Sequence, residues 1–140
     1  FRRVLFRSDL QFDNVIISES SEFKVIDWRH EFGSIVEYGD IYYDLAKLYG
    51  GFIIDYSKIK TNNFTINLEG TRVYLDIPNI ANHTYYIQTL LEYIRNSGYN
   101  EKKVKLVVPL IFWNIAPLHT PPFDLFLWYL SMMMFAEAGL

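Results

Sequence analysis

The sequence predicts one α+β domain that is mostly helical, and three observations carry this prediction. Short apolar runs separated by polar turn residues occur twice, at 14–27 and at 64–77, which is the pattern of two antiparallel hairpins. Apolar residues recur at helical spacing over four other stretches, which begin near residues 40, 80, 101 and 123. The chain has 140 residues, of which 51% are hydrophobic and 18% aromatic, and this is enough to bury one core.

The first hairpin joins two apolar runs, Asn14 to Ser18 and Phe23 to Asp27. The polar turn ESSE at 19–22 separates the runs, and the second strand ends on an acid. Residues 28–39 then show no clear period and contain two glycines. A connection of this length without its own secondary structure is typical of a functional loop.

The first helix is expected to begin after Asp40, because an aspartate can accept hydrogen bonds from the unpaired backbone N–H groups of a first turn. Ile41, Leu45 and Leu48 then share one helix face. The two glycines at 50–51 predict the end of this helix.

A second hairpin follows, with strands at 64–69 and 72–77 and a turn at 70–71. Three helices are expected after it, over about 80–97, 101–116 and 123–137. Pro109 predicts a kink in the second of them, or a helix start nearer residue 108. The last helix is apolar nearly all round, and we expect it to be buried.

Composition excludes several classes of function. The net charge of −3 does not favour nucleic acid as a partner. The absence of cysteine excludes disulfides and thiolate metal sites, and it fits a reducing compartment. Residues 106–135 contain no Lys or Arg, but polar residues divide this stretch into runs shorter than the roughly 18 to 20 residues of a membrane span. Two buried helices are therefore expected there in place of a membrane segment.

Three polar residues around the first hairpin form a candidate site. A hairpin brings the start of one strand beside the end of the next, so Asn14 and Asp27 are expected to be neighbours in space. An amide oxygen and a carboxylate that converge there suit Mg²⁺. Asp9, on the preceding loop, could accept a proton from an attacking hydroxyl. Taken singly, each residue is also an ordinary turn or strand-end residue. The occurrence of all three in this order favours the functional interpretation.

Three motifs in order then indicate a family. The chain reads D-L-Q-F-D-N from Asp9 to Asn14, I-D-W at 26–28, and G-D-I-Y-Y-D-L-A at 39–46. It resembles the C-terminal lobe of the aminoglycoside phosphotransferase and choline kinase-like family, which has the protein-kinase-like fold and carries H-x-D-L-x-x-x-N, I-D-W and G-D-x-x-x-D-L-A. The resemblance is specific over residues 8–49, and beyond them only a helical subdomain is expected.

The resemblance implies roles for five residues. Asp9 is the catalytic base that orients the acceptor hydroxyl, and Asn14 and Asp27 are the Mg²⁺ ligands that bridge to the ATP phosphates. Asp44 supports the catalytic loop, and Asp40 caps the helix that carries Asp44. The C-terminal part, with the stretch NIAPLH at 114–119, is similar to family members from bacterial capsule or surface-polysaccharide gene clusters.

Two features depart from the family pattern. No G-x-G-x-x-G occurs and no lysine precedes Asp9, so the ATP-binding N-terminal lobe of the family is expected to be missing and its residues stay unassigned. Position 7 is Arg where the family has His. FRRVLFRS, residues 1–8, matches one reading frame of a widely used sequencing-adapter oligonucleotide. We therefore expect residues 1–8 to be artefactual and residues 9–140 to be a truncated, kinase-like C-lobe.

The expected function is that of a piece of a cytoplasmic, ATP- and Mg²⁺-dependent phosphotransferase. Its acceptor would be a hydroxyl on a small molecule, such as a sugar, an amino alcohol or an aminoglycoside-like compound, and the piece alone is expected to be inactive. Two alternatives stay open. One is a non-catalytic, pseudokinase-like scaffold. The other is a membrane-associated accessory protein of polysaccharide synthesis that uses residues 106–135.

Overall fold

The computed structural model describes residues 9–27 and 39–139. Over these residues the chain is α+β and mostly helical, with two small antiparallel hairpins, which confirms the predicted class at this level. The expected segment at 1–8 and most of the loop at 28–39 lie outside the described residues.

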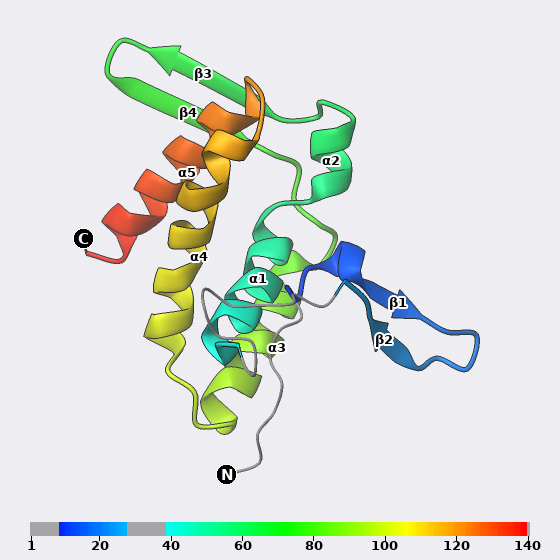
Figure 1. The fold of residues 1–140 in the computed structure, drawn as a ribbon. Coiled ribbons are helices and arrows are strands. Elements are labelled where there is room, and N and C mark those ends of the chain that lie inside the picture. Colours follow the sequence, from blue (N-terminus) through cyan, green and yellow to red (C-terminus); the bar gives the residue numbers. More distant parts are fainter. Residues whose placement is uncertain (1–8, 28–38, 140) are drawn as a thin grey trace.

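The helices form the body of the molecule (Figure 1). They are α1 (Ile41–Ile53), α2 (Tyr56–Lys60), α3 (His83–Asn96), α4 (Glu101–Ile115) and α5 (Phe123–Glu137), with short 3-10 turns η1 (Phe12–Asn14) and η2 (Ala116–Leu118). α4 lies between α1 and α5, and α3 packs beside α1. The helices at 83–96, 101–115 and 123–137 agree with the predicted ranges to within a few residues.

The core lies where α1, α3, α4 and α5 meet. Val104 and Val108 of α4 are almost fully buried, as are Ile94 of α3 and Phe126 and Leu127 of α5. The apolar stripes that predicted these helices are thus the faces that the helices bury against one another.

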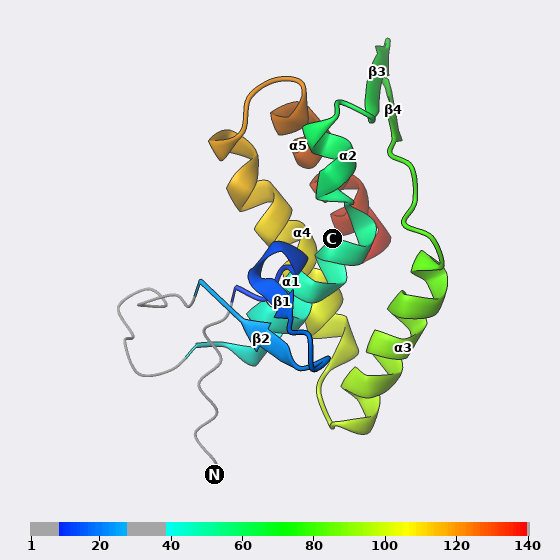
Figure 2. The same cartoon turned by 90° about the vertical axis from the view of Figure 1, so that its right-hand side faces the viewer.

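The two hairpins leave this body at different places (Figures 1 and 2). β1 (Val15–Ile17) pairs with β2 (Phe23–Val25), and Val15 lies opposite Val25. β3 (Thr65–Glu69) pairs with β4 (Arg72–Asp76), and their turn contains Gly70 at a φ of +60°. β3 and β4 both contact α5, whereas the β1–β2 hairpin projects from the helices. Both hairpins form between the strands that the sequence predicts.

The glycine pair at 50–51 does not end α1, and that prediction is wrong. The helix continues to Ile53, with Ile54 at its C-cap. A Cβ at Gly50 would lie 3.2 Å from the Phe112 ring, and one at Gly51 would lie 3.2 Å from the Phe12 ring. The glycines therefore allow α1 to approach two aromatic rings closely, a tertiary role that local sequence signals do not reveal.

The last helix is only partly buried, which corrects a second prediction. Phe126 and Leu127 are 1% and 0% exposed, but Trp128 and Met133 are 41% and 45% exposed. α5 packs on α4 and on the β3–β4 hairpin, and these neighbours leave part of its circumference open. Pro109 lies inside α4, which begins at Glu101 and not near residue 108. None of the helices over the described residues combines the length and the apolar character of a membrane span.

Candidate active site

The segment from Asp9 to Asn14 folds back on itself through its own hydrogen bonds. The Asp9 carbonyl oxygen accepts bonds from the Gln11 backbone N–H at 2.7 Å and from Asn14 Nδ2 at 3.0 Å. The Asn14 backbone N–H donates to the Gln11 carbonyl at 2.9 Å. Asn14 is 6% exposed, so its side chain ties the loop together from a buried position. The structure thus brings together Asp9 and Asn14, two of the predicted site residues.

At the base of the first hairpin, backbone pairing brings the residue before Asp27 opposite Asn14. The Ile26 backbone N–H donates to the Asn14 carbonyl at 2.8 Å, so the ladder continues one step past Val15 and Val25. Asp27 is the next residue, and it is exposed. The register therefore places Ile26 opposite Asn14 and Asp27 one residue further along, and the convergence of the Asn14 and Asp27 side chains stays a prediction.

Both acids of the site have left-handed backbone conformations. Asp9 has a φ of +40° and Asp27 a φ of +57°. Residues other than glycine adopt positive φ uncommonly, although Asp and Asn do so more readily than most. Such positions cluster at sites where the surrounding structure fixes the direction of a side chain. Here they mark the two ends of the segment that carries the candidate residues.

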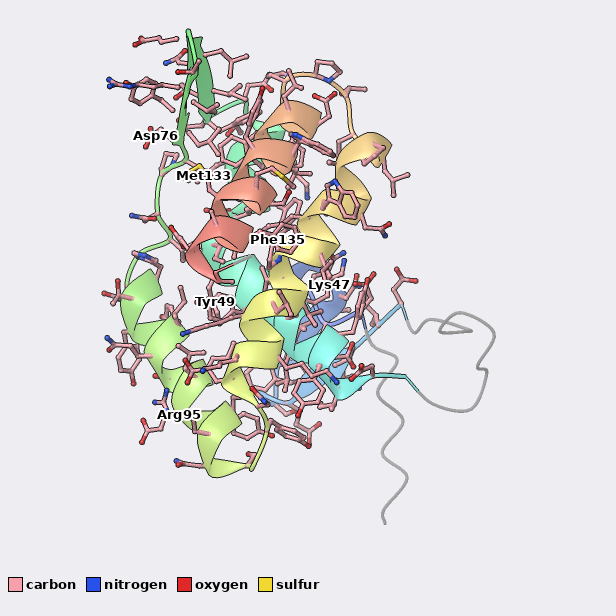
Figure 3. The ribbon with its side chains drawn as sticks, turned by 90° about the vertical axis from the view of Figure 1, so that its left-hand side faces the viewer. Lys47, Tyr49, Asp76, Arg95, Met133 and Phe135 are labelled. Atoms are coloured by element: carbon pink, nitrogen blue, oxygen red, sulfur yellow. The ribbon has the colours of Figure 1, made fainter. Side chains whose placement is uncertain are left out.

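Lys47 contacts the predicted catalytic base. Its Nζ lies 2.9 Å from Asp9 Oδ1, and the two side chains are 11% and 15% exposed. The same Nζ lies 5.7 Å from the centre of the Tyr43 ring. Figure 3 labels Lys47 on α1, beside the segment that carries η1. The sequence reasoning gave Lys47 no role, although it follows Asp44 by three residues and so belongs to the same helix face.

The start of α1 holds the other two predicted residues. Asp40 is the N-cap, and its Oδ1 accepts a bond from the Tyr42 backbone N–H at 2.8 Å, as the sequence predicts. Asp44 lies in the first turn and is 3% exposed. The described contacts do not test whether Asp44 supports the catalytic loop, and that role stays a prediction. Asp44 does occupy the helix that positions Lys47 against Asp9.

A pocket of about 130 Å³ opens beside this site. Its walls come from η1, α1, α2 and α4, and they are mostly apolar. Gln11, Lys47 and Tyr56 are among the polar residues that line it. Burial, and to a smaller extent the neighbouring charges of Asp9 and Asp13, together raise the pKa of Tyr56 to about 12. The phenol of Tyr56 is therefore neutral at ordinary pH.

The predicted magnesium ligands, Asn14 and Asp27, have oxygen atoms of the type that Mg²⁺ prefers. Among residues 9–27 and 39–139, no group of three or more His, Cys, Asp or Glu side chains is placed to hold a metal ion. Mg²⁺ in phosphoryl-transfer sites commonly uses one or two protein oxygens and completes its shell with phosphate and water. The Asn14 amide uses Nδ2 for the loop, so the oxygen Oδ1 and the Asp27 carboxylate are the atoms that could bind Mg²⁺.

Comparison with protein-family models, with curated proteins and with solved structures gave no match.

Proposed function

We propose that residues 9–139 form the catalytic lobe of a small-molecule phosphotransferase that uses Mg²⁺ and ATP. The observation that carries the proposal is the loop from Asp9 to Asn14, which the Asn14 Nδ2 bond to the Asp9 carbonyl closes and which leads into the hairpin that ends at Asp27. Asp9 also pairs with Lys47 of the helix that bears G-D-x-x-x-D-L-A. The pattern of an aspartate, an asparagine five residues later and a strand-end aspartate is the arrangement of phosphoryl-transfer sites. The cytoplasm is the proposed location, because ATP is supplied there.

Each residue of this chain has one task in the proposed reaction. Asp9 accepts the proton of the attacking hydroxyl while a bond forms between that oxygen and the γ-phosphorus, and the bond from the γ-phosphorus to the ADP oxygen breaks. Asn14 and Asp27 would hold Mg²⁺, which neutralises phosphate charge when bound. Lys47 fixes the direction of the Asp9 carboxylate through the contact at 2.9 Å. The acceptor is a hydroxyl on a sugar, an amino alcohol or an aminoglycoside-like compound.

The remaining parts of the machinery are proposed to come from outside these 140 residues. Phosphoryl transfer from ATP needs a glycine-rich segment over the phosphates and a lysine that pairs with them, and neither precedes Asp9. The chain alone should therefore neither bind ATP tightly nor turn it over. A micromolar Kd for ATP, measured by calorimetry on the 140-residue chain, would contradict this part of the proposal.

The activity itself is tested on a longer polypeptide that contains residues 9–140 behind a glycine-rich lobe. We expect ³¹P NMR to show ADP and a phosphate monoester when Mg²⁺, ATP and a panel of hydroxyl acceptors are supplied. Asp9→Asn and Asp27→Asn should each lower the rate by a factor of at least 100, since base and metal ligand both act at the reacting phosphate. Asp76→Asn is the matched control, because Asp76 is exposed at the end of β4, away from the pocket lining. Equal rates in all three variants would overturn the assignment.

A further inference from the structure

The pocket beside the Asp9–Lys47 pair is kept open by the glycines of α1. Gly50 and Gly51 both line it, between Phe12 of η1 and Phe112 of α4. A Cβ at either glycine would lie 3.2 Å from one of these rings, so any larger residue would push a ring toward the space. Helix interiors disfavour glycine relative to alanine, so two successive glycines here are unfavourable for the helix itself. The open wall of the pocket is the structural result of their small size.

The walls of the pocket differ in polarity along its length. Val108, Ile111 and Phe112 of α4 are 1%, 7% and 3% exposed and form an apolar side. Lys47 and Tyr56 also line the pocket, and Lys47 reaches Asp9 Oδ1 at 2.9 Å. Gln11 and Asp13 of the loop that follows Asp9 line the pocket too. The polar part of the wall therefore includes residues next to the candidate base.

We propose that this pocket binds a small compound with one six-membered, mostly apolar ring and a single hydroxyl, and that the hydroxyl lies at the end formed by Lys47 and Tyr56. A cavity of about 150 Å³ lined by apolar side chains holds one benzene-sized ring. The pocket here measures about 130 Å³ and carries polar groups at one end, so a ring with one hydroxyl is the matching class. Such a compound differs from the polar acceptors of the proposed function, and its binding in the pocket does not rest on that function.

The test uses benzyl alcohol and toluene as probes on the complete 140-residue chain. We expect ¹H–¹⁵N NMR titration with benzyl alcohol to give saturable shifts, with a low-millimolar Kd, at the backbone amides of Phe12, Gly50, Gly51 and Ile111. Ala46→Leu places a larger side chain in the pocket wall and should weaken binding at least tenfold. Ala136→Leu, on the exposed side of α5, is the matched control and should leave the Kd unchanged.

Two further variants keep the test decisive. If Ala46→Leu does not fold, Gly50→Ala replaces it, because alanine favours the helix while its methyl group crowds Phe112. Tyr56→Phe keeps the ring of Tyr56 and removes its hydroxyl. It should lower the preference for benzyl alcohol over toluene about fivefold, with little change in the Kd for toluene.

Three outcomes would overturn the inference. They are the absence of saturable shifts, equal Kd values for wild type and the crowded variant, and shifts centred on the exposed rings of Trp113 and Trp128. The proposed function fails separately. If benzyl alcohol binds in the pocket but the longer polypeptide transfers no phosphate, the pocket stands and the phosphotransferase assignment falls. If phosphate is transferred but neither probe binds, the reverse holds.

Discussion

The helical body and the first hairpin of this chain are stabilised by different kinds of contact. In the body, Phe126 and Leu127 are 1% and 0% exposed and pack among four helices. In the β1–β2 hairpin, Phe23 and Ile17 are 73% and 63% exposed, and each strand has three residues. A two-stranded hairpin of this size is marginal by itself in water. Its position therefore depends on the contacts at its base, where Asn14 binds Asp9 and Phe12 meets Gly51.

The largest effect is expected from a pair of matched phenylalanine deletions. Phe126→Ala should lower the free energy of unfolding by about 3–5 kcal/mol, because it removes a fully buried ring and leaves a cavity. Phe23→Ala should change it by less than about 0.5 kcal/mol, because that ring is exposed. Urea denaturation followed by circular dichroism measures both. Similar losses in the two variants would show that the hairpin belongs to the cooperative core.

Asn14→Ala tests the base of the hairpin directly. It removes the Nδ2 bond to the Asp9 carbonyl from a buried position and should cost about 1–3 kcal/mol. Amide hydrogen exchange at Gln11, whose N–H shares that carbonyl, should become faster, while exchange in α4 changes only with global stability. Asn67→Ala, on an exposed position of β3, is the control. Unchanged exchange at Gln11 would mean that Asn14 does not hold the loop.

Asp40 caps α1, the helix that carries Lys47 of the candidate site. Asp40→Ala should cost about 1 kcal/mol by removing the bond to the Tyr42 backbone N–H, whereas Asp40→Asn should keep most of the stability. Thermal unfolding of both variants makes the comparison. If Asp40→Asn lowers the stability as much as Asp40→Ala, the charge of Asp40 and its weak contact with Lys103 matter more than the cap.

The smallest expected effect is a dependence of the stability on pH that comes from His119. Burial lowers the pKa of His119 below its usual value of 6.5, and the Asp124 charge partly opposes this. The unfolded chain therefore binds a proton at a pH where folded His119 is still neutral, and stability should fall as the pH drops from about 7 toward 5. His119→Gln should flatten this dependence, while the control Leu118→Ala, at an exposed position beside it, should not. An equal slope in wild type and His119→Gln would contradict the assignment.

The sequence predicted those helices and strands that are determined by residues close together in the chain. Asp40 is followed by a helical apolar stripe, so the start of α1 could be placed, and the turn residues between apolar runs gave both hairpins and their strands. The glycine pair at 50–51 misled, because its role is to let Phe12 and Phe112 approach α1. The short helix α2 was missed because five residues carry too little periodicity, although Asp55 caps it with a bond to the Ser57 N–H.

The same distinction holds at the candidate site. The backbone pairing that continues to Asn14 and Ile26 follows from hairpin geometry, and the sequence was sufficient to predict the hairpin, whereas the convergence of Asn14 and Asp27 stays a prediction. Lys47 and Tyr56 could not be found this way. Lys47 meets Asp9 from 38 positions away in the chain (47 − 9), and Tyr56 joins the pocket only because α2 turns beneath η1. Such contacts depend on how the elements pack, and the motif at 39–46, which directly precedes Lys47, does not specify them.

The central claim is that Asn14 and Asp27 are the metal ligands beside Asp9. Mn²⁺ has the ligand preferences of Mg²⁺ and broadens NMR signals near its binding site, so titration of the 140-residue chain with Mn²⁺ tests the claim directly. We expect the earliest broadening at the amides of Asp9, Asn14 and Asp27, and its loss in Asp27→Asn but not in Asp76→Asn. Earliest broadening around other exposed carboxylates, or a pattern that Asp27→Asn leaves unchanged, would contradict the account.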